Sequence, residues 1–190
     1  MKYQGLITRM LVQTLVSMAV IGIVLFIAAG DWRWLQAWMF LAETTVLSIA
    51  ISLWLVRHDP ALLETRLSPP FQRDQKRWDR LFMVSVLFLF MAWMVVIGLD
   101  ARFGLSTMPA ILQGVGAILI ALCMLACWQV FRFNSFAAPQ VRIQADRAQT
   151  VIDTGPYGIV RHPIYTGLIF GMLVTGVAKI GRATSELQSP

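Results

Sequence analysis

Residues 81–99 read LFMVSVLFLFMAWMVVIGL, nineteen consecutive positions without a charged side chain. An α-helix rises 1.5 Å per residue and the hydrocarbon core of a bilayer is about 30 Å thick, so this run is long enough to cross a membrane. The whole chain shares this character. Of its 190 residues 57% are hydrophobic and only 14% are charged, whereas soluble domains have roughly a quarter charged residues. The sequence therefore predicts an integral membrane protein.

Further apolar runs lie on both sides of this stretch. Three are long enough to span a bilayer and a fourth is shorter; they are residues 10–29, 34–56 and 110–131, and then 164–178. The first exceeds the apolar part of a signal peptide, which has about 7–15 residues, and we interpret it as a retained helix. We predict an all-α, polytopic membrane helix bundle with about five hydrophobic helices. Its expected parts are a four-helix transmembrane region (1–131), a polar cytoplasmic segment with the following helix (132–178) and a short polar tail (179–190).

The distribution of basic residues predicts the orientation. Lysines and arginines outnumber acidic residues by 16 to 10, which gives a net charge of +6. Twelve of the basic residues lie before the first run or in the segments 57–80 and 132–161, and only Arg33 and Arg102 lie in the other two connections. The positive-inside rule then places the N-terminus and both basic segments in the cytoplasm. Because the charges lie between apolar runs, we expect a lipid bilayer as partner and no nucleic acid.

Polar and small residues inside the runs have competing interpretations. Glu43 lies near the middle of its run, where a carboxylate costs a few kcal/mol; it either faces a functional cavity or is protonated and hydrogen-bonded to a neighbouring helix. Cys123 and Cys127 are one helical turn apart and project in parallel, which suits packing better than a disulfide. Gly114 and Gly116 lie inside a helix with no preceding strand, so we expect them to pack rather than to bind a nucleotide.

The segment 141–171, VRIQADRAQTVIDTGPYGIVRHPIYTGLIFG, carries most of the polar chemistry. Its TGPYG at 154–158 predicts a tight turn, because glycines allow unusual dihedrals and proline fixes φ. Proline is well tolerated at the first position of a helix, so we expect a helix to begin at Pro163. Arg161 and His162 then lie beside a positive helix N-terminus at the membrane boundary, a place suited to an anionic group.

Small residues recur along the helix that this segment begins. Gly167, Gly171 and Thr175 are four residues apart and form a stripe that allows close approach of a helix or of a flat ligand. Tyr165 lies on the turn nearest the histidine. Together these features predict an anion- and ring-binding pocket at the cytoplasmic interface. In the alternative interpretation the arginine anchors the helix to lipid headgroups and the glycines only pack.

These motifs have a known counterpart. The string GPY at 155–157, followed at fixed spacing by RHPxYxG at 161–167, resembles the signature of the isoprenylcysteine carboxyl methyltransferase family, which is related to membrane phospholipid methyltransferases. The strings NSF at 134–136 and VRIQ at 141–144 are similar to bacterial members. The specific similarity covers about residues 132–171. The helices before this segment are similar to those of the family only in general type.

The resemblance implies a methyltransferase that binds S-adenosylmethionine without a Rossmann domain, between the cytoplasmic ends of its last helices. The acceptor would be lipophilic, with a carboxylate as the nucleophile. No residue is assigned a bond-making role, because a carboxylate needs no general base. No metal is expected. Carried over by position, the implied cofactor contacts are Gln149, Thr150, Val151, Ile152, Tyr157, His162, Pro163, Ile164 and Tyr165, with Arg161 beside them. Gln149 stands where other members have histidine, so this position forms hydrogen bonds but carries no charge.

The chain departs from the family pattern after this helix. Members continue with a return helix and a cytoplasmic segment whose arginine and glutamates complete the site, whereas this chain stops at Pro190. Arg182 and Glu186 follow Tyr165 too closely for a helix to cross and return, so we expect either a fragment or a naturally shortened form, with half a site. The alternative function is a catalytically silent membrane scaffold. The length and motif spacing disfavour a nicotinamide-dependent reductase, and a single intramembrane charge, Glu43, disfavours a transporter.

Overall fold

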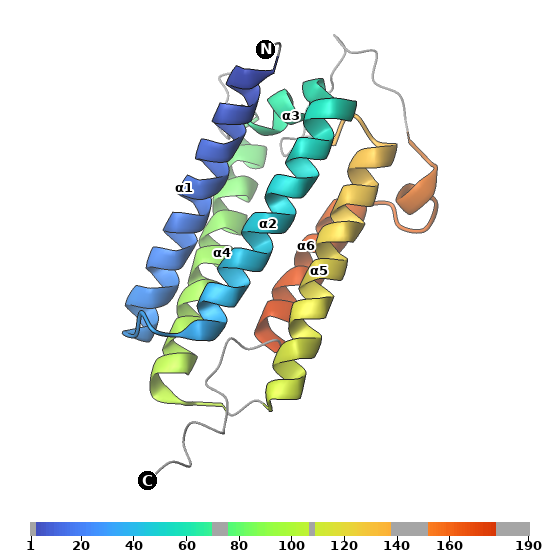
Figure 1. Cartoon of the computed structure of the whole chain (residues 1–190). Coiled ribbons are helices and arrows are strands. Elements are labelled where there is room, and N and C mark those ends of the chain that lie inside the picture. The colour runs from blue at the N-terminus through green and yellow to red at the C-terminus, as the bar shows by residue number, and fades with distance from the viewer. Residues whose placement is uncertain (1–2, 70–75, 107–108, 138–151, 178–190) are drawn as a thin grey trace.

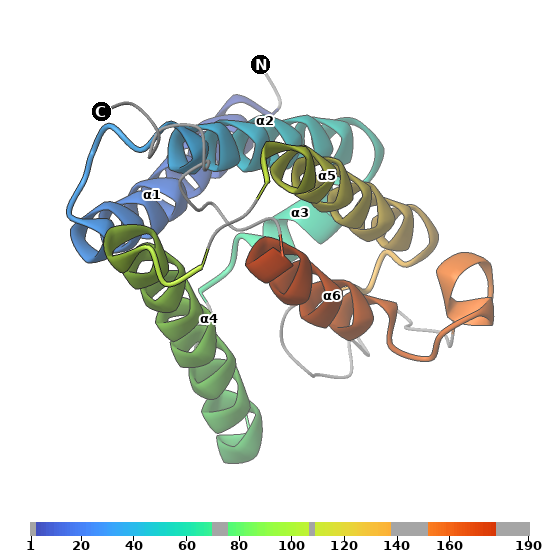
Figure 2. The ribbon, with the colours of Figure 1, turned by 90° about the horizontal axis from the view of Figure 1, so that it is seen from below.

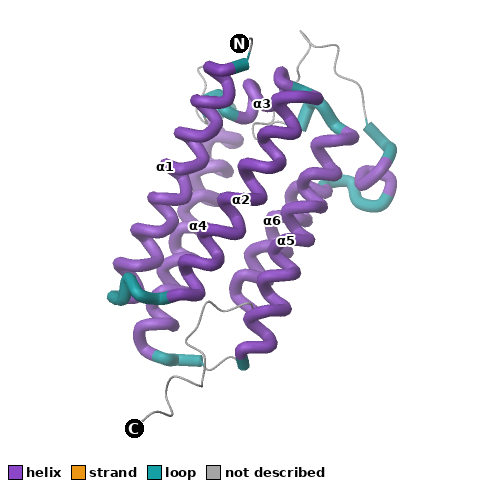
Figure 3. The backbone as a smooth tube through the Cα atoms, viewed as in Figure 1, coloured by secondary structure: helices purple, strands orange, loops and turns teal. Residues whose placement is uncertain are grey.

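The computed structural model describes residues 3–69, 76–106, 109–137 and 152–177. Within these ranges every regular element is helical, so the predicted all-α bundle is confirmed (Figures 1 and 3). The elements are α1 (Gln4–Ala29), α2 (Leu35–His58), α3 (Pro60–Arg66), α4 (Arg77–Phe103), α5 (Ala110–Phe133), the 3-10 turn η2 (Gly155–Gly158) and α6 (Pro163–Val177).

Four of the helices, α1, α2, α4 and α5, are long and apolar enough to cross a membrane. Their surfaces carry more large apolar side chains than the surface of a water-soluble protein does. Among them are Ile27, Phe88 and Ile111, each at least 70% exposed. This is the pattern of a multi-pass membrane protein. The shorter α6 has 15 residues and a length of about 22 Å, less than the hydrocarbon thickness.

Local sequence sets the helix ends. Gly30 and Gly104 end α1 and α4 in the left-handed conformation, with φ of 68° and 59°, and each donates its N–H to the carbonyl four residues back. The segment 57–80 was expected only as a connection, but it contains α3. The Asp59 carboxylate accepts the Leu62 N–H at 2.9 Å, and Pro60 occupies the first helical position.

Two buried clusters hold the bundle together. One joins α1, α2 and α4 to single residues of α5 and α6. The other joins α1, α2, α3 and the end of α5. Helices α1 and α4 approach each other closely, because a Cβ on Gly98 would lie 2.6 Å from the Cβ of Ala28. Small residues at this crossing let the two backbones approach closely.

Successive spanning helices run in opposite directions, so the connections alternate between the two ends of the bundle (Figure 1). The start of α1, the end of α2, α3, the start of α4 and the end of α5 share one end, which we call the basic end. The α1–α2 connection and the end of α4 lie at the opposite end. Of the described basic residues, those in elements at the basic end are Arg9, Arg57, Arg66, Lys76, Arg77, Arg80 and Arg132; Arg33 and Arg102 lie at the other end, and Arg161 comes shortly before α6.

Candidate functional site

The GPY turn lies against the end of α5. Gly155 has a φ of 60°, and a Cβ added to it would lie 2.6 Å from the ring atoms of Phe133. Glycine alone satisfies both the left-handed conformation and the close approach of the ring. The turn is closed by the Val160 N–H, which donates to the Pro156 carbonyl at 3.0 Å. The predicted turn is therefore present and is fixed to α5.

A side-chain hydrogen bond also joins this turn to the residue that follows α5. Asn134, the first residue after α5, accepts the Phe136 N–H through its Oδ1 at 2.8 Å. This leaves its Nδ2 to donate to the Tyr157 hydroxyl at 2.6 Å. The Tyr157 ring packs against the buried cluster at the basic end. The tyrosine of GPY therefore has a structural role here, and its hydroxyl is already engaged.

The helix that follows begins at Pro163, as predicted. Pro163 and Ile164 are half-buried, and Ile164 packs on the same cluster as the GPY tyrosine. Figures 1 and 2 both show α6 beside α5. The His162 carbonyl accepts the backbone N–H and the hydroxyl of Thr166, each at 3.1 Å. These bonds fix the backbone of the RHP motif at the helix start.

The side chains of Arg161, His162 and Tyr165 are exposed. The His162 and Tyr165 rings have centroids 5.9 Å apart, and Tyr165 meets Phe82 of α4 edge-on at 6.0 Å. Arg161 forms no hydrogen bond or ion pair within the part of the chain that the structure describes. The structure thus brings the histidine and tyrosine rings close together at the start of α6, where Tyr165 contacts α4.

The predicted site residues therefore fall into separate groups. One group consists of Tyr157 and Ile164, which pack against the buried cluster that includes the end of α5, and of the half-buried Pro163. His162 and Tyr165 remain open, with Arg161 exposed nearby, and Ile152 is half-buried. The remaining predicted residues lie outside the described ranges: Gln149, Thr150, Val151, Arg182 and Glu186.

The small-residue stripe on α6 is used mainly for packing. A Cβ on Gly167 would lie 3.4 Å from the Cys127 sulfur of α5. Thr175 is buried, and its hydroxyl accepts the Trp93 indole N–H of α4 at 3.2 Å. Gly171, between them, has no described atom within 4 Å of an added Cβ. Two of the three positions thus join α6 to its neighbours, and the middle one stays open.

Arg66 makes contacts that the sequence did not predict. It ends α3, its Nη1 donates to the Ala137 carbonyl at 3.0 Å, and its guanidinium lies over the Phe131 ring at 4.3 Å from the ring centre. Burial lowers the pKa of this guanidinium. In sequence it is one of six basic residues in its segment, with nothing to single it out. It joins α3 to the segment that carries Asn134.

Glu43 is half-buried on α2 and forms no hydrogen bond with the described residues. Cys123 and Cys127 are free thiols. Among the described residues, no group of three or more histidine, cysteine, aspartate or glutamate side chains lies close enough to hold a metal ion.

Comparisons with protein-family models, with curated proteins and with solved structures gave no match. Any assignment of function therefore depends on the motif residues and on their geometry.

Proposed function

We propose that the chain is an integral membrane S-adenosylmethionine-dependent methyltransferase, which acts on a lipophilic carboxylate at the cytoplasmic face. One observation carries the proposal. The GPY and RHPxY motifs, whose spacing resembles that of the isoprenylcysteine carboxyl methyltransferase family, are held by a glycine-specific turn and a part-buried hydrogen bond. This arrangement leaves the side chains of His162 and Tyr165 exposed at the start of α6, with their ring centroids 5.9 Å apart.

The charge distribution supports the cytoplasmic placement. The turn packs on the cluster at the basic end, where most described basic side chains lie. Basic residues flanking spanning helices are retained on the cytoplasmic side. The proposed site therefore faces the compartment that supplies a water-soluble nucleotide, while the acceptor can approach from the bilayer between helices.

The open residues suit a charged nucleoside cofactor. The exposed Arg161 guanidinium can pair with a carboxylate, and the neighbouring imidazole and phenol offer ring faces and hydrogen-bonding atoms. S-adenosylmethionine supplies an electrophilic methyl group on a positively charged sulfur. The acceptor oxygen forms its bond to the methyl carbon as the carbon–sulfur bond breaks, so the two opposite charges disappear together. The chain's contribution is to position the reactants and exclude water, which favours such charge neutralisation.

Equilibrium binding of S-adenosylmethionine to the detergent-purified chain, measured by titration calorimetry, tests the proposal. We expect His162→Ala and Tyr165→Phe each to weaken binding about tenfold, the effect of one lost hydrogen bond to a ligand. His58→Ala is a matched control, because His58 is also exposed at the basic end but stacks on Trp54. Absence of binding by the parent chain at millimolar cofactor would refute the proposal.

A membrane scaffold without catalysis is the second candidate. It is favoured by the packing of Tyr157 and Ile164 against the buried cluster at the basic end, which gives these two predicted site residues structural contacts. The same titration separates the two functions. A folded parent chain that binds no cofactor supports the scaffold. Binding that is weakened by His162→Ala and Tyr165→Phe but not by His58→Ala supports the enzyme.

A further inference from the structure

A cluster of aromatic and basic side chains lies where α2 and α5 end, at the basic end of the bundle. The two helices pack against each other and run in the same direction (Figures 1 and 2). Trp54 of α2 and Trp128 of α5 meet edge to face across the seam between them, with ring centroids 5.7 Å apart. Both lie about one turn before the end of their helix. The contact therefore places the last turns of the two helices beside each other.

On α2 the tryptophan carries a histidine. The His58 ring stacks on the Trp54 ring, with centroids 4.4 Å apart and planes at 10°. Its Nδ1 lies 2.9 Å from the Trp54 carbonyl oxygen. Because a carbonyl only accepts, Nδ1 carries the hydrogen of this bond. The side chain is exposed, and Nε2 has no hydrogen-bond partner within the part of the chain that the structure describes. When His58 is protonated, Nε2 donates, and the indole face stabilises the charge.

On α5 the tryptophan carries an arginine. The exposed Arg132 guanidinium lies over the Trp128 ring, 5.0 Å from the ring centre. Its Nη1 donates to the Gln129 side-chain oxygen at 3.1 Å, and most of its five N–H groups remain available. Each basic residue follows its tryptophan by four positions, which is one helical turn. His58 and Arg132 therefore lie at the same level on the two sides of the seam, one turn nearer the basic end than the tryptophan pair.

The cluster of these four residues, which we call the α2–α5 cluster, offers mainly hydrogen-bond donors. The indole N–H groups of Trp54 and Trp128 form no hydrogen bond with a described residue, and neither nitrogen is enclosed by protein atoms. The carboxylate that follows His58 in the chain, Asp59, accepts the Leu62 N–H at the start of α3. Two basic groups with open donors suit the oxygens of an anion.

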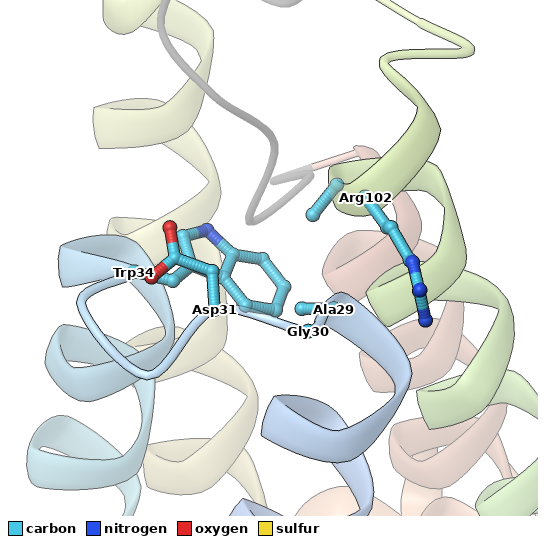
Figure 4. Close-up of a pocket in the computed structure, with 6 residues that line it drawn as sticks. Ala29, Gly30, Asp31, Trp34 and Arg102 are labelled. Atoms are coloured by element: carbon cyan, nitrogen blue, oxygen red, sulfur yellow. The ribbon is translucent and has the colours of Figure 1, made fainter.

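The opposite end of the bundle offers an anion a less uniform environment. Figure 4 shows a pocket of about 300 Å³ there, between the α1–α2 connection and the last turn of α4. The residues that line it include Trp34 and Arg102, but also the acidic Asp31. An anion in that pocket would meet repulsion from the carboxylate, whereas both ionisable side chains of the α2–α5 cluster are basic.

We propose that the α2–α5 cluster binds the phosphate group of an anionic phospholipid, in the leaflet at the basic end. A lipid is favoured over a soluble anion because α2 and α5 are both long and apolar enough to cross a membrane, and the cluster is at their ends. Tryptophans gather at the membrane–water interface, and basic groups between helices bind anionic headgroups there. The net positive charge of the cluster disfavours a headgroup that carries its own ammonium group.

A structural role must be separated from lipid recognition. Arg132 and His58 lie in the last turns of their helices, where a positive charge is favourable to the helix dipole. A loss of this effect lowers stability with and without lipid. A loss of recognition raises the dissociation constant for one kind of headgroup. The experiment therefore measures both the dissociation constant and the Tm.

The test compares three ligands of the detergent-purified chain by titration calorimetry: dioctanoyl phosphatidylglycerol, dioctanoyl phosphatidylcholine and inorganic phosphate. We expect phosphatidylglycerol to bind most tightly. Arg132→Gln and Trp128→Phe should each weaken its binding about tenfold, the effect of one lost bond to a charged group. Arg77→Gln and Trp78→Phe are matched controls, because both residues are exposed at the basic end but belong to α4. They should leave the binding unchanged.

Each contrary outcome overturns the proposal. Equal binding of phosphatidylcholine would show that charge is not recognised, and equal binding of inorganic phosphate would show a site for free anions. Equal losses in the α4 controls would show only general attraction to a basic surface. A lower Tm in Arg132→Gln with an unchanged dissociation constant would leave the arginine a structural role alone. None of these measurements uses S-adenosylmethionine, so this proposal and the proposed function can fail separately.

Discussion

Replacing Gly155 by alanine should open the turn that holds the GPY motif against α5. Two costs add at this position. A residue with a Cβ at a φ of 60° loses about 1–2 kcal/mol in the left-handed conformation. The new methyl group would also lie 2.6 Å from the Phe133 ring, and overpacking of this kind costs about 1–3 kcal/mol. We therefore expect the turn to be destabilised by about 2–5 kcal/mol.

Amide hydrogen exchange, followed by mass spectrometry in detergent micelles, measures this opening directly. The reporting amides are those of Tyr157, Ile159 and Val160, which donate to carbonyls within the turn. A loss of 2 kcal/mol corresponds to roughly 30-fold less protection, and larger costs to more. Protection in Gly155→Ala within twofold of the parent chain would refute the reasoning.

Two other glycines separate the contributions. Gly104 has nearly the same φ, 59°, but nothing within 4 Å of an added Cβ, so Gly104→Ala should show only the dihedral cost of about 1–2 kcal/mol. Gly114 lies within α5 with open space around it, so Gly114→Ala should be neutral or stabilising. Adding Phe133→Ala to Gly155→Ala should recover the overpacking part alone. No recovery would show that the ring is not the cause.

Two further substitutions test the packing around the site. Asn134→Ala removes the donor to Tyr157 and should cost about 1–2 kcal/mol of turn stability by the same exchange measurement. Asn134→Asp can still accept from the tyrosine hydroxyl and should retain most of the turn stability. Equal losses in the two variants would contradict the assigned bond. Gly98→Ala places a Cβ 2.6 Å from that of Ala28 and should lower the free energy of unfolding in mixed micelles by about 1–3 kcal/mol. Adding Ala28→Gly should restore part of this loss. Unchanged stability in Gly98→Ala would disprove the close crossing of α1 and α4.

The bundle was largely predictable because hydropathy marks the part of each helix inside hydrocarbon. It marks only that part. The first run was placed at 10–29, whereas α1 begins at Gln4, because backbone hydrogen bonding continues into the polar interface. The short α3 was missed although Asp59 and Pro60 form a recognisable helix start. A seven-residue helix adds little to any hydropathy average, so capping residues are the better signal there.

The site was predictable only where it is local in sequence. The turn and the start of α6 at Pro163 follow from glycine and proline within a few residues of one another. The bond between Asn134 and Tyr157 joins residues 23 positions apart. The pocket that contains Trp34 and Arg102 joins segments still farther apart. Such pairs become neighbours only through helix packing, and a single sequence carries no periodic signal for them.

The crossing of α1 and α4 also has a consequence for biosynthesis. Its two contact points, Ala28 and Gly98, are 70 residues apart in the chain. At about 5–20 residues per second, the ribosome needs roughly 4–14 s to make the second after the first. During that interval the face of α1 that α4 will cover has no partner from α4. The contact between these two helices should therefore form late in the synthesis of the chain.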